Sequence, residues 1–290
     1  MDSFLVITNE RKDRDRVITK QIEDYIKAAG RKCTLIGTLE LETERISPDL
    51  NVECAIVLGG DGTLIRCATH LMKLDIPMLG INLGTIGFLA EIEKNHITEA
   101  LDRLFLDDYV LENRMILRGD LHLGANRKHS DNNDSFTGYA LNDIVITRKG
   151  LSRIISLRIY VNDQLVDDYR GDGVIVSTPT GSTAYNLSAG GPIITPKANV
   201  MVITPICPHS LSPRSVVVSA DDVVKVVVRR SKKTQYDEAI ATFDGQAVID
   251  LGTDDEILIE KAQYETRLIR LNQTGIYEIL RSKLTGCSDL

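Results

Sequence analysis

The first 110 residues alternate two hydrophobic patterns. Four short apolar segments are typical of strands: residues 4–8, 32–36, 52–58 and 76–81. Three longer segments repeat apolar residues every three or four positions, as amphipathic helices do: residues 17–29, 63–74 and 97–106. The segment 52–58 (VECAIVL) has apolar residues on both faces, which is typical of a buried parallel strand. The alternation predicts an α/β domain over residues 1–110, built on a doubly wound parallel sheet.

After residue 110 strand-like segments follow one another. They are residues 115–123, 140–148, 154–161, 173–177, 200–206, 215–228, 240–243, 247–251 and 256–259. Turn signals such as Asp244-Gly245 separate several of them, so residues 111–271 are predicted to form an all-β, sandwich-like domain with a helical insertion near 183–189. The polar stretch 124–138 predicts an exposed loop. Residues 274–284 predict a short terminal helix, which we expect to pack back on the first domain.

Composition and charge narrow the classes of partner. The 290 residues carry a net charge of -7, and Lys and Arg are scattered, so neither nucleic acid nor a membrane surface is an expected partner. The five cysteines are irregularly spaced without a CxxC pair, which argues against a disulfide framework or a zinc ribbon. The chain opens without a basic leader, and no apolar segment approaches the roughly 20 residues of a membrane span. These features predict a cytoplasmic protein.

The first candidate for chemistry is the turn Gly59-Gly60-Asp61-Gly62-Thr63, between a buried strand and a helix. Ligands of open α/β sheets bind at this edge, and glycines let a phosphate approach the backbone. A carboxylate in the turn would repel phosphate, so Asp61 is expected to meet a hydroxyl as a general base, or a magnesium ion. The alternative is a tight turn in which Asp61 only caps the helix.

A second glycine loop, residues 82–89 (NLGTIGFL), follows the next strand at the same edge. Its Phe88 could stack on a base or simply belong to the core. The chain contains no GxxxxGK[ST], and no GxGxxG links a strand to a helix. A P-loop enzyme and an ordinary Rossmann dehydrogenase are therefore disfavoured.

The densest candidate is the stretch 170–188, in which Arg170-Gly171-Asp172-Gly173 leads through a strand to Ser177-Thr178-Pro179-Thr180-Gly181-Ser182-Thr183. Five hydroxyl residues within seven positions exceed what helix capping requires, so they are interpreted as donors for phosphate or ribose. Asn142-Asp143 could bind vicinal ribose hydroxyls or make a turn. Asp244-Gly245-Gln246, by itself, is typical of a plain hairpin turn.

Six segments together resemble the NAD kinase family. They are GGDGT at 59–63, NLGTIGFL at 82–89, LND at 141–143, GDGVIVSTPTGSTAYNLSAGGPII at 171–194, PHSLSPR at 208–214 and DGQ at 244–246. GGDGT also occurs in lipid kinases and phosphofructokinases, whereas the stretch around STPTGSTAY is highly specific. The resemblance implies transfer of the terminal phosphate of ATP to the 2′-hydroxyl of the adenosine ribose of NAD, which makes NADP.

The resemblance also implies roles for individual residues. Asp61 is expected to be the catalytic base, and Gly59, Gly60, Gly62 and Thr63 to form the phosphate loop. Residues expected to bind NAD are Asp61, Gly62, Arg66, Phe88, Asn142, Asp143, Arg153, Arg170, Asp172, Thr183, Ala184, Tyr185, Asn186, Leu187, Ser188 and Gln246. Relatives often supply some of the positions matched by Arg153, Arg170 and Asp172 from a neighbouring subunit. A homodimer or homotetramer is expected, with Mg²⁺ accompanying ATP and no metal ligands assigned.

Two other readings stay open at this point. A diacylglycerol-type lipid kinase shares the GGDGT loop, but it should carry an apolar acceptor pocket or an interfacial amphipathic helix. A non-catalytic NAD(P)-binding sensor would need the binding loops without the base, whereas this chain has Asp61 beside an intact hydroxyl loop. Formation of product distinguishes both from an NAD kinase.

Overall fold

The computed structural model describes residues 1–43, 51–84, 87–124, 135–150, 154–210, 214–230, 238–271, 278, 280 and 281. The chain forms two compact units, Met1–Asn113 with Glu265–Leu290, and Arg114–Tyr264. The expected boundary after residue 110 therefore lies after Asn113, and the expected end of the β domain at 271 lies at Tyr264. Across the described ranges, no helix is long and apolar enough to span a bilayer.

The first unit is built on a parallel sheet. Strands β1 (Ser3–Thr8), β2 (Lys32–Gly37), β3 (Cys54–Gly59) and β4 (Met78–Asn82) run in the order β4-β3-β1-β2. The short strand β5 (Ile92–Glu93) pairs with β4, and so does the end of the long strand β17 (Glu256–Arg270), through Leu268 and Met78. This arrangement confirms the predicted α/β fold.

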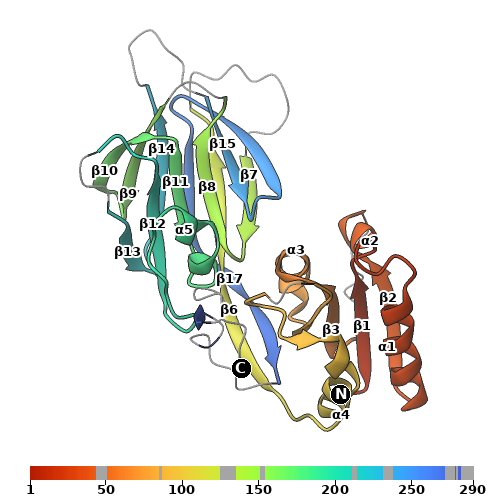
Figure 1. Ribbon diagram of the computed structural model, residues 1–290. Helices are drawn as coiled ribbons and strands as arrows, with labels where there is room; N and C mark the ends of the chain where they lie inside the picture. The colour runs from red at the N-terminus through yellow and green to blue at the C-terminus, as the bar shows by residue number, and fades with distance from the viewer. Residues whose placement is uncertain are drawn as a thin grey trace. The chain divides into compact units, whose positions relative to one another are not determined.

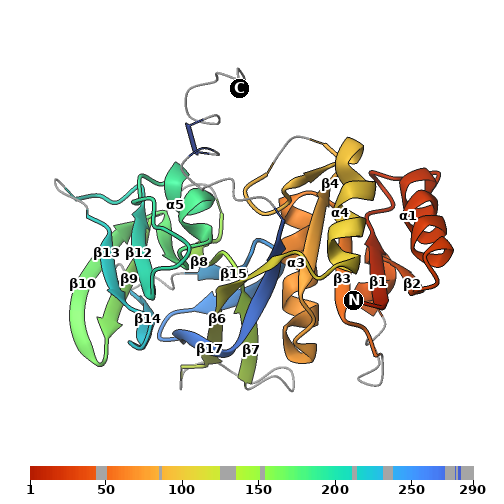
Figure 2. The same cartoon turned by 90° about the horizontal axis from the view of Figure 1, so that it is seen from below.

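Helices cover both faces of this sheet. Helices α1 (Val17–Ala28) and α4 (Ile97–Phe105) share a core with one set of alternating strand residues, such as Val6, Ile56 and Leu79. Helix α3 (Asp61–Leu71) packs on the opposite face, where a Cβ on Gly80 would lie 2.4 Å from Leu64. Figure 2 shows α1 beside α4 at the sheet. Helix α2 (Thr38–Thr43) and the single turns η1 (Met72–Leu74) and η2 (Lys94–His96) complete the unit.

The order of the strands creates a switch point between β1 and β3. The chain leaves β1 through α1 toward β2 on one side, and it leaves β3 through α3 toward β4 on the other. Ligands of open α/β sheets bind at the carboxyl ends of the strands where such a reversal occurs. The loops after Thr8 and Gly59 are therefore the expected ligand-binding edge.

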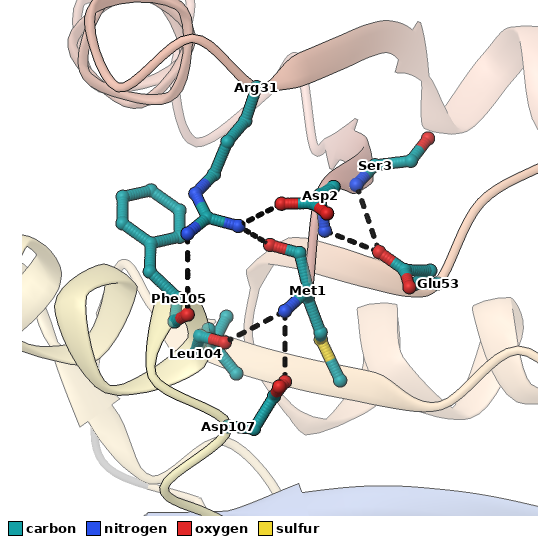
Figure 3. A network of polar contacts seen from close by, with 8 residues as sticks. All are labelled: Met1, Asp2, Ser3, Arg31, Glu53, Leu104, Phe105 and Asp107. Atoms are coloured by element: carbon teal, nitrogen blue, oxygen red, sulfur yellow. Dashed lines mark hydrogen bonds and ion pairs between the residues drawn. The ribbon is translucent and has the colours of Figure 1, made fainter.

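At the amino ends of the strands, Arg31 connects several elements of the first unit; it lies at the end of the α1–β2 connection (Figure 3). Its guanidinium donates to the carbonyl of Met1, to the carboxylate of Asp2 and, at 3.3 Å, to the carbonyl of Phe105. The same group lies 4.4 Å from the centroid of the Phe105 ring. These contacts tie α1, β1 and α4 together, far along the strands from the carboxyl edge.

The second unit consists of two β-sheets, with the labels of Figure 1. One sheet has the order β13 (Val216–Ser219), β12 (Val200–Ile206), β11 (Gly173–Ser177), β8 (Asp143–Arg148), β15 (Glu238–Phe243) and β16 (Ala247–Gly252). The other joins β10 (Gln164–Gly171), β9 (Ile155–Val161), β14 (Val224–Arg229) and β17, with β6 (Val110–His122) and β7 (Ser135–Ala140). Their apolar side chains form one core, as in the predicted sandwich.

Several local predictions differ from the structure. Strand β10 was not predicted, and the segment 215–228 is two strands, β13 and β14, separated by a turn. Residues 135–138 of the expected loop belong to β7, whereas 125–134 lie outside the described residues. The predicted terminal helix 274–284 also lies largely outside them, although Leu280 is buried.

Candidate active site

The Asp61 carboxylate is held by the second glycine loop. Oδ2 accepts a hydrogen bond from the backbone N–H of Phe88 at 2.6 Å, and Oδ1 accepts from Leu89 and Ala90 at 3.1 and 3.2 Å. Asp61 is the first residue of α3, directly after Gly60 in extended backbone. A carboxylate offers about four lone-pair positions, and these donors occupy three of them. Among the described residues Oδ2 accepts a single hydrogen bond, which leaves one position for a further proton donor.

Close packing explains two glycines at this edge. A Cβ on Gly87 would lie 1.8 Å from Asp61 Oδ1, and a Cβ on Gly59 would lie 2.3 Å from Thr63 Oγ1. The end of the second loop is fixed in turn by Arg270, which donates to the Leu89 carbonyl at 3.1 Å and to Glu112 at 2.7 Å. The two predicted glycine loops therefore meet around one carboxylate. Thr85 and Ile86 of the second loop lie outside the described residues.

The other residues of the first unit that were predicted to bind a ligand differ in how exposed they are. Gly62 is exposed, and Arg66 and Phe88 are half-buried, so all three have surface available to a ligand. Thr63 is buried, and its hydroxyl accepts from Asn9 Nδ2 at 2.9 Å, which makes it a structural part of the loop. Asn9 was not predicted as a site residue, although it follows β1 at the same carboxyl edge of the sheet as Asp61.

In the second unit, three predicted segments come together around Asp244. Its carboxylate accepts hydrogen bonds from the backbone N–H groups of Leu141 and Asn142, both at 2.7 Å, and of Asp143 at 3.1 Å. The carbonyl of Asn142 accepts from the N–H of Thr178 at 2.8 Å. Asp244 does lie in the hairpin between β15 and β16, but its carboxylate also positions the Asn142-Asp143 pair.

The five hydroxyl residues at 177–183 require a correction. Ser177, Thr178 and Ser182 are fully buried and donate to carbonyl groups: Thr178 to Leu141 at 2.6 Å, and Ser182 to Pro179 at 2.6 Å. Thr180 accepts from Arg114 at 3.2 Å, and Thr183 donates to the Thr180 carbonyl at 3.3 Å. These hydroxyls hold the loop in shape instead of forming a set of free ligand donors.

The helical insertion that follows offers fewer exposed side chains than the motif suggests. The Asn186 amide is fully buried, donating to the carbonyls of Ser182 and Pro192 at 3.2 and 3.0 Å and accepting from Thr204 at 2.7 Å. Its side chain therefore supports the loop. Tyr185 is 45% exposed, Ser188 is exposed, and the remaining predicted residues, Thr183, Ala184 and Leu187, are half-buried. Tyr185 thus presents a ring face to solvent.

Burial perturbs the pKa values of two carboxyl groups in this cluster, and one of the two is also repelled by the charge of the other. Burial, followed by the charge of Asp244, raises the pKa of Asp143 to about 7. Burial also raises the pKa of Asp244 to about 6, although its three backbone donors act in the opposite direction. Because Asp244 has those donors, we expect it to ionise first, which leaves Asp143 protonated over part of the neutral range.

The remaining predicted residues lie at the surface of this unit. Arg170 is exposed and lines a polar cavity of about 430 Å³ with Arg158, Arg229 and Arg230, while Asp172 pairs with Arg148 at 2.7 Å. The Gln246 side chain is exposed in its hairpin. Arg153 lies outside the described residues, as do residues 211–213 of the PHSLSPR segment.

Two family models match most of the chain. The ATP-NAD kinase N-terminal domain matches residues 7–109, and the ATP-NAD kinase C-terminal domain matches residues 141–271. These ranges contain the Asp61 loops and the Asp244 cluster respectively.

Curated relatives and solved structures agree with the family models. The chain is 48% identical over 288 residues to an NAD kinase of Lachnoclostridium phytofermentans, covering 98% of this chain and 99% of the relative. It is 40% identical over 303 residues to an NAD kinase of Lachnospira eligens, covering 98% and 100%. An Archaeoglobus fulgidus NAD kinase in complex with ATP superposes with a TM-score of 0.73 at 25% identity, covering 98% and 100%. Yeast NADH kinase, complexed with NADH, shares the fold with a TM-score of 0.81 at 22% identity, covering 100% and 89%. The chain belongs to the ATP-NAD kinase family.

Proposed function

We propose that Asp61 is the general base of this NAD kinase. The enzyme transfers the terminal phosphate of ATP to the 2′-hydroxyl of the adenosine ribose of NAD and releases ADP and NADP. A bond forms between the ribose oxygen and the γ-phosphorus, the bond from that phosphorus to the ADP oxygen breaks, and the hydroxyl proton passes to Asp61. A positioned carboxylate assists such a proton transfer by about 10²–10⁴-fold.

The observation that carries this role is the way in which Asp61 is held. Three backbone N–H groups fix both carboxylate oxygens, yet Oδ2 accepts only one hydrogen bond from the part of the chain that the structure describes. The group therefore needs little reorganisation when a hydroxyl arrives, which is how preorganised sites lower a barrier. A plain helix cap would not require the second loop to close around the carboxylate.

Dinucleotide recognition is assigned to residues that are exposed or half-buried, together with the buried carboxyl group of Asp143. The proposed contacts are made by Gly62, Arg66, Phe88, Asn142, Asp143, Thr183, Ala184, Tyr185, Leu187, Ser188 and Gln246. Tyr185 offers a stacking face, and the buried Asn186 acts from behind it by holding the loop. We further propose that Arg153, Arg170 and Asp172 contact a dinucleotide bound mainly to a neighbouring subunit of a homodimer or homotetramer.

ATP is proposed to arrive with its own divalent cation. Within the described ranges, no group of three or more His, Cys, Asp or Glu residues could hold a metal ion. Mg²⁺ often relies on substrate phosphates and water for most of its ligands, so in this proposal the triphosphate itself carries the cation. The free thiols of Cys33, Cys54, Cys67 and Cys207 fit a reducing compartment, so we place the protein in the cytoplasm.

The function is tested by an endpoint assay for NADP with purified protein, Mg-ATP and NAD. We expect stoichiometric NADP and ADP, and no lipid phosphate when diacylglycerol replaces NAD. The comparisons lend no support to a lipid kinase or to a non-catalytic sensor. Phosphorylated lipid in place of NADP would establish the former, and NAD binding without any product would establish the latter.

A further inference from the structure

The turn that follows β1 is fastened at both ends. The Asn9 N–H donates to the Leu58 carbonyl of β3 at 3.0 Å, and its amide donates to Thr63 of α3 at 2.9 Å. At the other end, the Asp13 carboxylate accepts from the N–H and the hydroxyl of Thr19 at 2.9 and 2.7 Å. Between them, the Lys12 N–H donates to the Asn9 carbonyl at 2.9 Å. The backbone of Lys12 is thus held at the switch point between β1 and β3.

The Lys12 ammonium lies against both glycine loops. A Cβ on Gly60 would lie 2.9 Å from Lys12 Nζ, and a Cβ on Gly84 would lie 3.7 Å from it. Gly60 is the N-cap residue of α3, and because it has no side chain it makes no capping hydrogen bond to the first N–H groups of the helix. A positive charge therefore sits beside the N-terminus of an 11-residue helix, where both the side chain and the helix favour an anion.

The acidic side chains nearest in sequence and structure already have other partners. Glu10 accepts from the Thr38 hydroxyl at 2.7 Å, Asp13 holds Thr19, and Asp61 accepts from the second glycine loop. Among the described residues, no carboxylate forms an ion pair with Lys12, whose side chain is exposed. The ammonium is consequently free to bind an incoming anion.

A buried amide beside Gly84 also lacks an acceptor. Asn82 is 3% exposed, and its Oδ1 accepts from the N–H of Gly84 at 2.9 Å. Its Nδ2 is buried and meets no hydrogen-bond acceptor in the part of the chain that the structure describes. A buried donor without a partner costs free energy, and a bound oxygen ligand would supply the missing acceptor.

We propose that Lys12 binds the triphosphate of the donor nucleotide, with the Asn82 amide as a second donor at the same place. This inference rests on the proposed function. Because Gly60 is next to Asp61, the proposed base, we assign Lys12 to the phosphates of ATP and not to those of NAD. The phosphoryl group in transit must lie next to the hydroxyl that Asp61 activates, and the donor's terminal phosphates extend from it. Lys12 then neutralises charge on those phosphates and orients them.

The test compares Lys12→Met and Lys12→Arg with the control Lys20→Met, which removes an exposed lysine from α1. Steady-state kinetics give kcat/KM for Mg-ATP at saturating NAD, and for NAD at saturating Mg-ATP. Calorimetry measures Mg-ATP binding directly, so it tests the role of Lys12 even if NAD is not the phosphate acceptor. We expect Lys12→Met to lower kcat/KM for Mg-ATP and the ATP affinity by about 10- to 100-fold, the usual loss of a charge-assisted hydrogen bond.

The same variant should change kcat/KM for NAD by less than about threefold, and Lys12→Arg should recover most of the loss because it keeps the charge. Unchanged ATP binding in Lys12→Met would overturn the assignment. An equal loss toward ATP and NAD, or a loss confined to NAD, would also overturn it. A wild-type enzyme that makes no NADP but binds Mg-ATP through Lys12 would defeat the proposed function alone.

Discussion

At the scale of single residues, the same carboxylate is both a hydrogen-bond acceptor for the backbone and the proposed base. Asp61→Asn would keep one carbonyl oxygen but would turn an amide N–H₂ toward backbone donors of residues 88–90. We expect kcat to fall by about 10²–10⁴-fold, because the proton acceptor is lost. Calorimetric NAD binding should persist, since Asp61 is only one of many groups proposed to bind the dinucleotide.

Asp24→Asn, on the exposed face of α1, serves as the control for a general effect of removing a negative charge. Turnover at the wild-type rate in Asp61→Asn would remove Asp61 from the catalytic role. Loss of NAD binding with no change in the rate at saturation would instead make Asp61 a binding residue only.

A second residue-scale effect concerns Asp143. Its pKa is raised from the ordinary 3.8 to about 7, so the folded chain binds a proton that the unfolded chain releases near pH 4. A group raised in this way stabilises the fold below its unfolded pKa, and that contribution disappears as the pH rises through the folded pKa. Ionised Asp143 therefore lowers the free energy of unfolding above about pH 7.

Asp143→Asn should remove this destabilisation, because the amide stays neutral at every pH. Relative to wild type, we expect the variant to gain on the order of 4 kcal/mol in free energy of unfolding between pH 4 and pH 8, because a pKa raised from 3.8 to about 7 corresponds to that energy. Urea unfolding followed by circular dichroism measures the difference, because the chain has no tryptophan. Asp221→Asn, at an exposed turn, is the control. A difference between variant and wild type that does not change with pH would contradict the raised pKa.

At the scale of elements, the two glycine loops act as one device. Gly87 is not in the left-handed region, so its small size is required by the Asp61 carboxylate and not by its backbone. Gly87→Ala should push the carboxylate or the loop aside and lower kcat by about 10²-fold, as misplacement by about 1 Å can do. Gly252→Ala is the control, because its Cβ would meet only Asp255, at 3.7 Å. Wild-type kcat in Gly87→Ala would show that the two loops need not close on Asp61.

The same scale shows what hydrophobic patterning can predict. The buried strands β3 and β11 were found because their apolar residues are continuous. Strand β10 (QLVDDYRG) was missed because six of its eight residues are exposed and several are charged. It pairs with β9 through its backbone, so its sequence shows no alternation of apolar and polar residues. The turn between β13 and β14 was missed because it contains no glycine or proline. Its shape is held instead by the Asp222 carboxylate, which accepts hydrogen bonds from the Asn162 amide and the Ser219 N–H.

The candidate site divides in a similar way. Residue identity and order were enough to select Asp61, the Asn142-Asp143 pair and the loop at 177–188 as candidates. They could not show which side chains point outward: Ser182 and Asn186 bear the same chemistry as a ligand donor, yet both are fully buried and bonded internally. Lys12 and Asn9 lie some 50 residues before the GGDGT turn and become its neighbours only through parallel pairing of β1 and β3.

At the scale of the whole molecule, strand β10 is expected to connect the association of subunits with the binding of NAD. It is the last strand of one sheet, and its free edge pairs with no strand among the described residues. Leu165 and Val166 on it are 56% and 36% exposed, and Arg170 follows on the same strand. An unpaired edge with apolar side chains favours association with another chain. We therefore expect a second copy to cover β10.

Leu165→Lys should weaken that association. Wild type should show a mass of two or four times 32.1 kDa in light scattering, and the variant should shift toward 32.1 kDa at the same concentration. If Arg170 serves the dinucleotide of the neighbouring subunit, the KM for NAD should rise as the assembly dissociates, and it should then depend on protein concentration. Val17→Lys, an equally exposed apolar position on α1, should change neither quantity. A monomeric wild type at micromolar concentration with undiminished activity would contradict both the assembly and the shared site, since no neighbour would then be present to supply Arg170.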